Sequence, residues 1–138
     1  QVIAFSRGRY RILGETLDLA LGNCLDRFAR VLQIPNDPSP GYNIEQLATR
    51  VGSLPLALPH PFYGVEVWPQ SLALPTLTKP LPLPKAVTHG LLESGEATVE
   101  DLCFSLQETA FSMVAEVTER ALALCRANRL LLVGGVAC

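Results

Sequence analysis

The sequence predicts an α/β fold, and three observations support this prediction. Residues 1–13 contain two short strand-like runs around a glycine turn, which is the pattern of a β-hairpin. Residues 18–51 and 98–124 repeat apolar side chains at helical spacing. Residues 130–133, with the sequence LLLV, form a wholly apolar run that is typical of a buried parallel strand. Strands and helices mixed in this way place the chain in the α/β class.

The hairpin is predicted with strands at residues 1–6 and 10–13 and with Gly8 in the turn between them. Basic residues at alternate positions of this segment are able to contact phosphate groups, or else they form the solvated edge of a strand. The sequence favours the solvated edge. These residues are Arg7, Arg9 and Arg11.

The first helix is expected after Asp18, whose side chain suits the N-cap position. One face of this helix should turn towards a core, because its apolar residues recur at the required spacing. They are Leu21, Leu25, Phe28 and Leu32. Prolines then end the helix, since each lacks an N–H and fixes its φ angle. They are Pro35, Pro38 and Pro40.

A second helix is predicted to open on Gly41. A glycine at a helix start lets a ligand approach free backbone N–H groups, where the helix dipole is positive. Helical spacing resumes at once after it. The apolar positions are Ile44, Leu47, Ala48 and Val51.

Two carboxylates, Asp26 and Glu45, lie just off the apolar stripes of these helices and are candidates to face a shared crevice. Each has a simpler structural interpretation. Asp26 has the spacing of an ion pair with Arg30 on a solvated helix face. Glu45 is expected in the first turn of its helix, where the dipole favours a negative charge. Spacing alone favours these simpler interpretations.

Residues 52–85 have a different character, since eight of the eleven prolines lie between Pro55 and Pro84. No central strand tolerates prolines at that density. Polyproline II or irregular structure is expected, and an SH3-domain ligand is the functional alternative. His60 lies in this segment and His89 beyond its far end, without metal-ligand spacing. We expect both histidines to be exposed.

Thr98 is expected to open a long helix, because Thr98 and Asp101 have the spacing of a capping box. The apolar face that follows should be core along its whole length. It comprises Val99, Leu102, Cys103, Leu106, Ala110, Met113, Val114, Val117, Ala121 and Leu124. The apolar run at 130–133 then ends in Gly134 and Gly135, at the carboxyl edge where α/β folds bind ligands. A Gly-Gly pair alone is more often a tight turn than a phosphate site.

Composition limits the functions to consider. The chain has 138 residues, of which 49% are hydrophobic and 17% charged, and this balance suits a buried interior. A net charge of -2 predicts no general electrostatic attraction of nucleic acid.

The four cysteines lack C-x-x-C spacing and are expected to be reduced cytosolic thiols. No apolar run is long enough to span a membrane, so no membrane partner is expected. Because the chain begins at Gln1 rather than methionine, the lack of a targeting segment decides little.

Two long runs resemble one protein family. They are GETLDLALGNCLDRFARVLQIPNDPSPGYNIEQLA and, later in the chain, EDLCFSLQETAFSMVAEVTERAL followed by LLLVGGVAC. Both resemble the O-sialoglycoprotein endopeptidase-like proteins, the family that contains bacterial TsaD. The similarity is greatest to the eukaryotic cytosolic and nuclear branch, the catalytic subunit of the KEOPS complex. No serine-histidine pair or H-E-x-x-H motif supports the endopeptidase activity of the old family name.

The resemblance implies a fold and a reaction. The fold is part of the second ribonuclease-H-like lobe of the actin-like ATPase (ASKHA) superfold. Residues 1–51 supply its hairpin and helix-loop-helix, and residues 86–138 supply its long helix, strand and Gly-Gly turn. The reaction transfers threonylcarbamoyl from its adenylate to adenosine 37 of ANN-decoding tRNAs. The implied partners are tRNA and the KEOPS subunits, including a kinase-like subunit and a small dimerising subunit, in the cytoplasm and nucleus.

The resemblance also assigns roles to residues. Asp26, Gly41 and Glu45 match substrate-contacting positions, and Gly134 and Gly135 match a turn of the nucleotide pocket. The family holds one divalent metal through an H-x-x-x-H pair and an aspartate, for which this chain has no counterpart. With the family match, the functional interpretations of Asp26 and Glu45 become the favoured ones.

Similarity to the family fails within residues 52–85 and returns near Ala86. Only Gly64, Glu66 and Val67 keep roughly the positions of a family loop there. We hypothesise that this segment comes from an altered reading frame or an alternative splice. Sequencing of the transcript tests the hypothesis, and an in-frame ancestral exon that codes for the segment would contradict it.

Three functional hypotheses follow. The first is a threonylcarbamoyl transferase that binds the adenylate, the second a non-catalytic interaction module for KEOPS partners, and the third a truncated product without function. The family's serine-glycine-glycine loop would precede Gln1, and its substrate asparagine would follow Cys138. We therefore expect the chain alone to be catalytically inactive.

Overall fold

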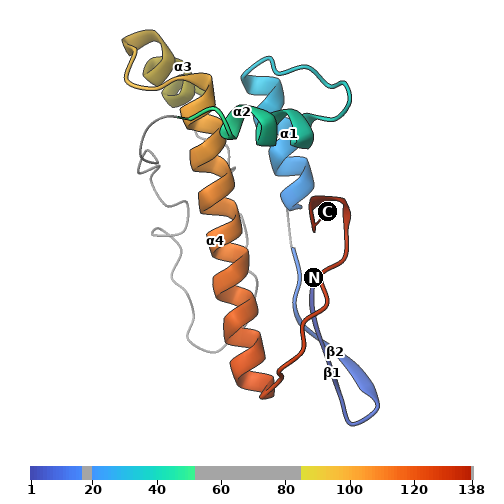
Figure 1. The fold of residues 1–138 in the computed structure, drawn as a ribbon. Helices are drawn as coiled ribbons and strands as arrows, with labels where there is room; N and C mark the ends of the chain where they lie inside the picture. The colour runs from blue at the N-terminus through green and yellow to red at the C-terminus, as the bar shows by residue number, and fades with distance from the viewer. Residues whose placement is uncertain (17–19, 52–84, 138) are drawn as a thin grey trace.

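The computed structural model describes residues 1–16, 20–51 and 85–137 of the chain. The hypotheses about the proline-rich segment, His60 and the N-cap role of Asp18 lie outside these residues. Within them the fold is α/β. A two-stranded hairpin lies near one end of a long helix, and shorter helices gather at the other end (Figure 1).

The hairpin consists of β1 (Val2–Ser6) and β2 (Arg9–Gly14), which pair antiparallel. Its two-residue loop, Arg7 and Gly8, has positive φ angles of 53° and 73°, as expected of a type I′ turn that fits the strand twist. Phe5 and Tyr10 face each other across the strands with ring centroids 4.8 Å apart. The predicted hairpin is therefore confirmed. Its arginines are exposed, in agreement with a solvated edge.

Two helices follow the hairpin. Helix α1 (Leu21–Val31) buries Leu25 and Phe28, as its apolar stripe predicted. It ends in a Schellman motif, in which the Ile34 N–H donates to the Ala29 carbonyl at 2.9 Å. Helix α2 (Pro40–Ala48) begins one residue earlier than predicted, because Pro40 itself occupies the first helical position.

Helix α3 (Lys85–Ser94) was not predicted from the sequence and ends at Gly95, whose φ angle is +75°. Helix α4 (Val99–Cys125) starts at the predicted capping box. The Thr98 hydroxyl accepts from the Asp101 N–H at 3.1 Å, and the Asp101 carboxylate accepts from the Thr98 N–H at 3.0 Å. The two bonds satisfy donors that the first helical turn leaves free.

The main core lies where α1 and α2 pack against the first half of α4 (Figure 1). Its most deeply buried side chains come from all three helices. They are Cys24, Phe28, Ala29, Ile44, Leu102, Cys103 and Leu106. Further along α4, the apolar face continues through Met113, Val117 and Ala121, and β1 contacts this helix. Most of the predicted helix face is thus confirmed.

The prediction for residues 130–133 was wrong. These residues form no strand, and Leu131 and Val133 expose 84% and 83% of their surface. A parallel strand is stable only with a neighbouring strand, and within the described residues the sheet contains β1 and β2 alone. Leu124 is also 63% exposed, because no described element covers it in the last turn of α4.

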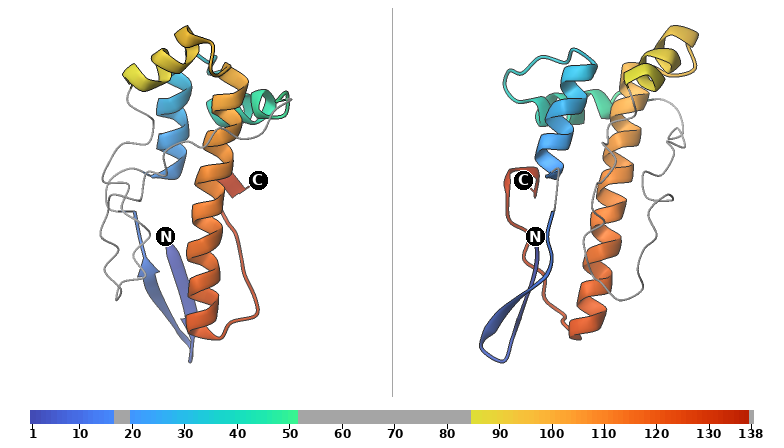
Figure 2. Two further views of the ribbon diagram at one scale, coloured as in Figure 1. Left: turned by 90° about the vertical axis from the view of Figure 1, so that its left-hand side faces the viewer. Right: turned by 180° about the vertical axis from the view of Figure 1, so that it is seen from behind.

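After α4 the chain reverses at Arg126, which adopts the left-handed conformation. Residues 127–134 then run back from the end of α4 towards α1 (Figures 1 and 2). They lead into the short 3-10 helix η1 (Gly135–Ala137), which packs against α1. This return places the Gly-Gly turn near the two helices that carry the other predicted site residues.

Candidate functional site

A pocket of about 450 Å³ lies among α1, α2, α4 and η1. Buried apolar side chains, polar groups and glycines all contribute to its walls. The lining residues are Leu25, Ser39, Gly41, Tyr42, Ile44, Glu45, Gln107, Phe111, Gly135, Val136 and Ala137. Clefts of this size and mixed lining are typical of small-molecule sites.

Three residues predicted from the sequence meet in this pocket. Gly41 and Glu45 come from α2, and Gly135 comes from the turn after the apolar run near the other end of the chain. Sequence separation alone does not place these residues together. Their convergence therefore indicates that the two matched runs contribute to a single site.

The first turn of α2 offers a free hydrogen-bond donor to the pocket. Pro40 has no N–H, and the Tyr42 N–H donates to the Ser39 hydroxyl at 3.3 Å. The Asn43 N–H donates to the Ser39 carbonyl at 3.1 Å. Within the described part of the chain, the Gly41 N–H is thus the donor of this turn that has no acceptor. The positive end of the helix dipole lies at the same place, which favours an anionic or oxygen-rich ligand.

Both pocket glycines leave space for a ligand. A β-carbon built on Gly41 or on Gly135 would meet no atom within 4 Å. Gly134 does not line the pocket, but its φ angle of +135° lies where side chains are rarely accommodated. The two glycines therefore have different roles. Gly134 allows the chain to turn, and Gly135 borders the pocket.

Glu45 does not occupy the position that its simpler interpretation requires. It is the sixth residue of α2 and lies in the second turn, where the dipole has less effect. Its side chain is exposed, lines the pocket and forms no ion pair with any described residue. The prediction of a first-turn position was therefore wrong. The Glu45 carboxylate instead lies at the pocket wall, and no other described residue bonds its oxygens.

Asp26 is exposed on α1 and is not among the lining residues of the pocket. Its neighbour Leu25 takes that place, since successive helical residues point about 100° apart. The expectation that Asp26 and Glu45 share this crevice is therefore not met. The alternative ion pair with Arg30 is also not formed, and the ion pair that the described residues do contain joins Arg120 and Glu116.

Sequence reasoning missed the side chains that α4 and the start of α2 bring to the pocket. Tyr42 and Phe111 border it with 49% and 41% of their surface exposed, and Gln107 adds an amide. Gln107 and Phe111 are four residues apart, so they share one face of α4. This spacing was available in the sequence, but the apolar stripe on the neighbouring face dominated the pattern.

The loop before α2 is fixed by one side chain. The Asn43 amide donates to the carbonyl oxygens of Pro35 and Asp37 at 2.7 Å and 3.0 Å. Asn43 itself belongs to α2, so the bonds connect the loop to the helix that carries Gly41 and Glu45.

Two buried thiols lie near the site but are unsuited to nucleophilic chemistry. Desolvation by burial raises the pKa of Cys24 to about 11, although the positive charge of Arg27 acts in the opposite direction. Desolvation and the nearby Glu100 raise the pKa of Cys103 to about 12. Both thiols are protonated at neutral pH and unreactive. Among the described cysteines, Cys24, Cys103 and Cys125 are not joined in a disulfide.

Comparison with known proteins identifies the family. The profile of the TsaD family, described as tRNA N6-adenosine threonylcarbamoyltransferase, matches residues 1–138. The chain belongs to the TsaD family. It is 55% identical over 138 residues to the tRNA N6-adenosine threonylcarbamoyltransferase of Homo sapiens, with 100% of this chain aligned. Identity is 54% over 138 residues to the protein of Xenopus laevis and 52% over 140 residues to that of Yarrowia lipolytica, again with 100% of this chain aligned.

The chain spans 38% of the length of each of these TsaD-family relatives. The divalent metal that the resemblance implies has no candidate site in the part of the chain that the structure describes, because no three of its His, Cys, Asp and Glu side chains cluster closely enough to hold an ion. His89 differs from the expected exposed side chain, since its Nε2 atom is buried and has no hydrogen-bond partner among the described residues. Among the described helices, none combines the length and apolar character needed to cross a bilayer.

Proposed function

We propose that this chain contributes to a tRNA N6-adenosine threonylcarbamoyltransferase by binding the nucleotide part of threonylcarbamoyl-adenylate in the pocket among α1, α2, α4 and η1. The observation that carries the proposal is the convergence of Gly41, Glu45 and Gly135 on one pocket. Family membership supplies the class of ligand, and the structure supplies groups that suit it.

Each pocket group suits one part of a nucleotide. The Glu45 carboxylate forms no bond with any other described residue and is able to accept hydrogen bonds from both ribose hydroxyls, which fixes the orientation of the sugar. The free N–H of Gly41 lies at the positive end of α2 and suits an oxygen of the ligand. The open space beside Gly41 and Gly135 allows the ligand to approach the backbone closely.

The proposed reaction is an acyl transfer. The exocyclic amine of adenosine 37 attacks the carbamoyl carbon of the adenylate, so that a new C–N bond forms. The bond from that carbon to the phosphate oxygen breaks, AMP leaves, and the amine gives up one proton. This chain's residues hold the leaving nucleotide in one orientation, which lowers the entropic part of the barrier.

We further propose that residues 1–51 and 86–138 belong to a ribonuclease-H-like lobe of the actin-like ATPase fold. Supporting this are the antiparallel hairpin, the long helix that contacts β1, and the glycine turn beside the pocket. Asp26 stays a proposed substrate contact through its match to the family. It lies outside this pocket, so its partner is expected on another part of the substrate.

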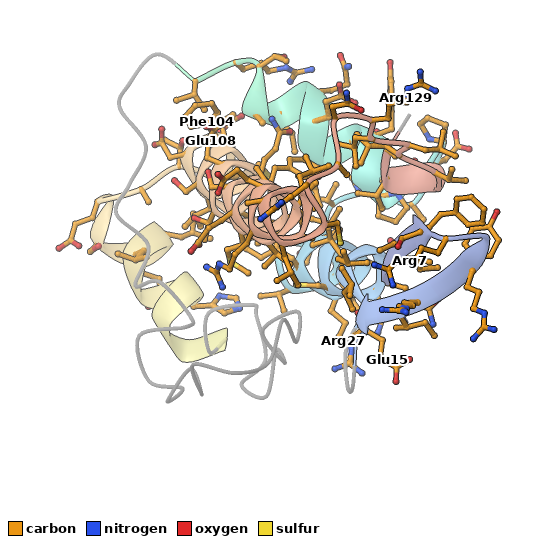
Figure 3. The ribbon with its side chains drawn as sticks, turned by 90° about the horizontal axis from the view of Figure 1, so that it is seen from below. Arg7, Glu15, Arg27, Phe104, Glu108 and Arg129 are labelled. Atoms are coloured by element: carbon orange, nitrogen blue, oxygen red, sulfur yellow. The ribbon has the colours of Figure 1, made fainter. Side chains whose placement is uncertain are left out.

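The test is titration of the purified chain with a non-hydrolysable threonylcarbamoyl-adenylate analogue, with and without a divalent metal. We expect binding that Glu45→Gln weakens about tenfold, because one or two charge-assisted hydrogen bonds are lost. Glu108→Gln is the matched control, since Glu108 is exposed and lies on the opposite side of α4 from the hairpin, outside the pocket lining (Figure 3). Absence of binding, or equal effects of the two variants, would overturn the proposal.

A second function, an interaction module for KEOPS partners, is favoured by a different observation. Ile3, Phe5, Tyr10 and Ile12 of the hairpin are each at least half exposed. Apolar side chains grouped in this way are typical of surfaces that other protein covers. Under this proposal the chain co-purifies with the kinase-like subunit or the small dimerising subunit, in the cytoplasm and nucleus. Substitution of Phe5 and Tyr10 by serine should abolish the co-purification while the adenylate analogue still binds.

A further inference from the structure

The α4 wall of the pocket has no role in the nucleotide contacts described so far. Gln107 and Phe111 form this wall, and they stand one helical turn apart on the same face of α4. The α2 groups that suit ribose and the ligand's oxygens come from another helix. The pocket lining therefore combines the polar groups of α2 with an aromatic ring and an amide from α4.

Phe111 is an unusual residue for an exposed helical position. It keeps 41% of its surface exposed, whereas its neighbours Ala110 and Met113 are buried. Its ring borders the pocket instead of the core. Leu25 and Ile44, which are 7% and 2% exposed, add apolar surface to the same pocket lining. A half-exposed ring in a lining that also contains apolar surface suits a flat, partly apolar group such as a purine.

The Gln107 amide is free to recognise such a group. It forms no hydrogen bond with any described side chain. A glutamine amide presents one donor and one acceptor edge, and this pair matches N7 and the 6-amino group of adenine. Hypoxanthine, which has a carbonyl at position 6, cannot satisfy the same pair.

From this arrangement we infer that the α4 wall is the purine subsite of the pocket, with Phe111 stacking on the base and Gln107 selecting the 6-amino group. The inference rests on the proposed nucleotide function and names the part of the ligand that fixes its specificity. Tyr42, 49% exposed on α2, adds a second aromatic wall. Base-aromatic stacking contributes about 1–3 kcal/mol per base, which corresponds to roughly five- to 150-fold in affinity.

The experiment is a titration of the 138-residue chain with AMP, inosine monophosphate and ribose 5-phosphate, followed by ligand-observed NMR. For the unmodified chain we expect AMP to bind best, with upfield shifts of adenine H2 and H8 caused by the aromatic ring. Phe111→Ala should weaken AMP binding at least fivefold and remove these shifts. Phe111→Tyr should retain both, because it keeps an aromatic face.

Selectivity provides the second test. Gln107→Leu should reduce the preference for AMP over inosine monophosphate about tenfold, a typical value for one bidentate base contact. Ribose 5-phosphate should bind equally to the unmodified chain, Phe111→Ala and Gln107→Leu. A melting curve by circular dichroism checks the fold, which truncation of a half-exposed ring should leave intact.

The outcomes separate the two claims. If AMP binds, Glu45→Gln weakens it and Phe111→Ala does not, the purine subsite is wrong and the nucleotide proposal stands. If the unmodified chain binds neither AMP nor ribose 5-phosphate, the nucleotide proposal itself fails. If Phe111→Ala weakens ribose 5-phosphate as much as AMP, the ring shapes the pocket and does not stack on the base, which also overturns the inference.

Discussion

At one end of α4, the apolar side chains of α1 and α2 are almost fully buried, and the pocket lies on the same group of helices. At the other end lie the hairpin and residues 130–133 (Figure 1), whose apolar side chains are largely exposed. We call these the helical end and the sheet end. Helices form their backbone hydrogen bonds internally, whereas each strand depends on its neighbours. The helical end therefore completes its packing within the described residues, and the sheet end does not.

The largest expected effect is a difference in the free energy of unfolding between two leucine-to-alanine variants. Leu106→Ala at the helical end should lower the free energy of unfolding by about 2–5 kcal/mol, because Leu106 is 1% exposed and its loss leaves a cavity. Leu131→Ala is the matched control, since Leu131 is 84% exposed and should change stability by less than about 0.5 kcal/mol. Urea denaturation measures both. Equal losses would show that the sheet end is packed in solution.

High pH should act on the helical end through its two buried thiols. The folded pKa values of Cys24 and Cys103, about 11 and 12, lie above the ordinary value of 9.0. The folded state therefore holds these protons more tightly than the unfolded state, and their stabilising contribution is complete below pH 9 and lost as pH rises towards 12. Cys24→Ala should make the urea midpoint fall less steeply above pH 9 than in the unmodified chain. An unchanged slope would contradict the burial of this thiol.

Thiol labelling sharpens the same comparison. Cys125, exposed in the last turn of α4, should react with iodoacetamide at pH 8 well before Cys24 and Cys103 do. Peptide mass spectrometry after timed quenching gives the three rates. Comparable rates in the absence of denaturant would mean that the core among α1, α2 and α4 opens readily.

The capping box should have a smaller effect. Thr98→Ala removes the hydroxyl that bonds the Asp101 N–H and should cost about 1 kcal/mol in urea denaturation. Thr98→Ser keeps a hydroxyl and should restore most of this loss. If both variants lose the same stability, packing of the threonine methyl group, and not the cap, determines the effect.

The smallest change in stability is expected at the pocket and should have the opposite sign. Gly41→Ala places a methyl group in open space within a helix and should stabilise the fold by about 0.5–1 kcal/mol. The same methyl group enters the ligand's space, so binding of the adenylate analogue should weaken at least tenfold. Gly90→Ala in α3 is the control, with a comparable gain in stability and unchanged binding. Equal binding of the adenylate analogue by the two variants would contradict the placement of Gly41 in the binding site.

Local signals in the sequence predicted the helical end well. The apolar stripe of α1 and the capping box of α4 depend on residues a few positions apart, and both were confirmed. The start of α2 at Pro40 also had a local signal, since proline is favoured at the first helical position. The strand at 130–133 was predicted wrongly because a strand's stability resides in its neighbours, which a local pattern does not contain.

The site shows the same limit. Gly41, Glu45 and Gly135 were predicted, and the structure brings them together. Asp26 was not brought into the pocket, because a one-residue difference in helical phase directs its neighbour there instead. The role of Phe111 in the pocket was not predicted, because an aromatic residue among apolar neighbours is normally assigned to the core. Only the structure shows that 41% of its surface is exposed.

The attachment of the loop to α2 by Asn43 has a consequence for the conditions under which the site keeps its shape. The two carbonyl oxygens that hold the loop are bonded by a neutral amide, which neither titrates nor attracts counterions. The geometry at the start of α2 should therefore be the same in dilute buffer and in strong salt, and at acid and neutral pH. Deamidation of this one residue to aspartate would turn two attractions into repulsions between oxygens. The shape of this end of the pocket thus depends on the covalent identity of residue 43 and not on its ionic surroundings.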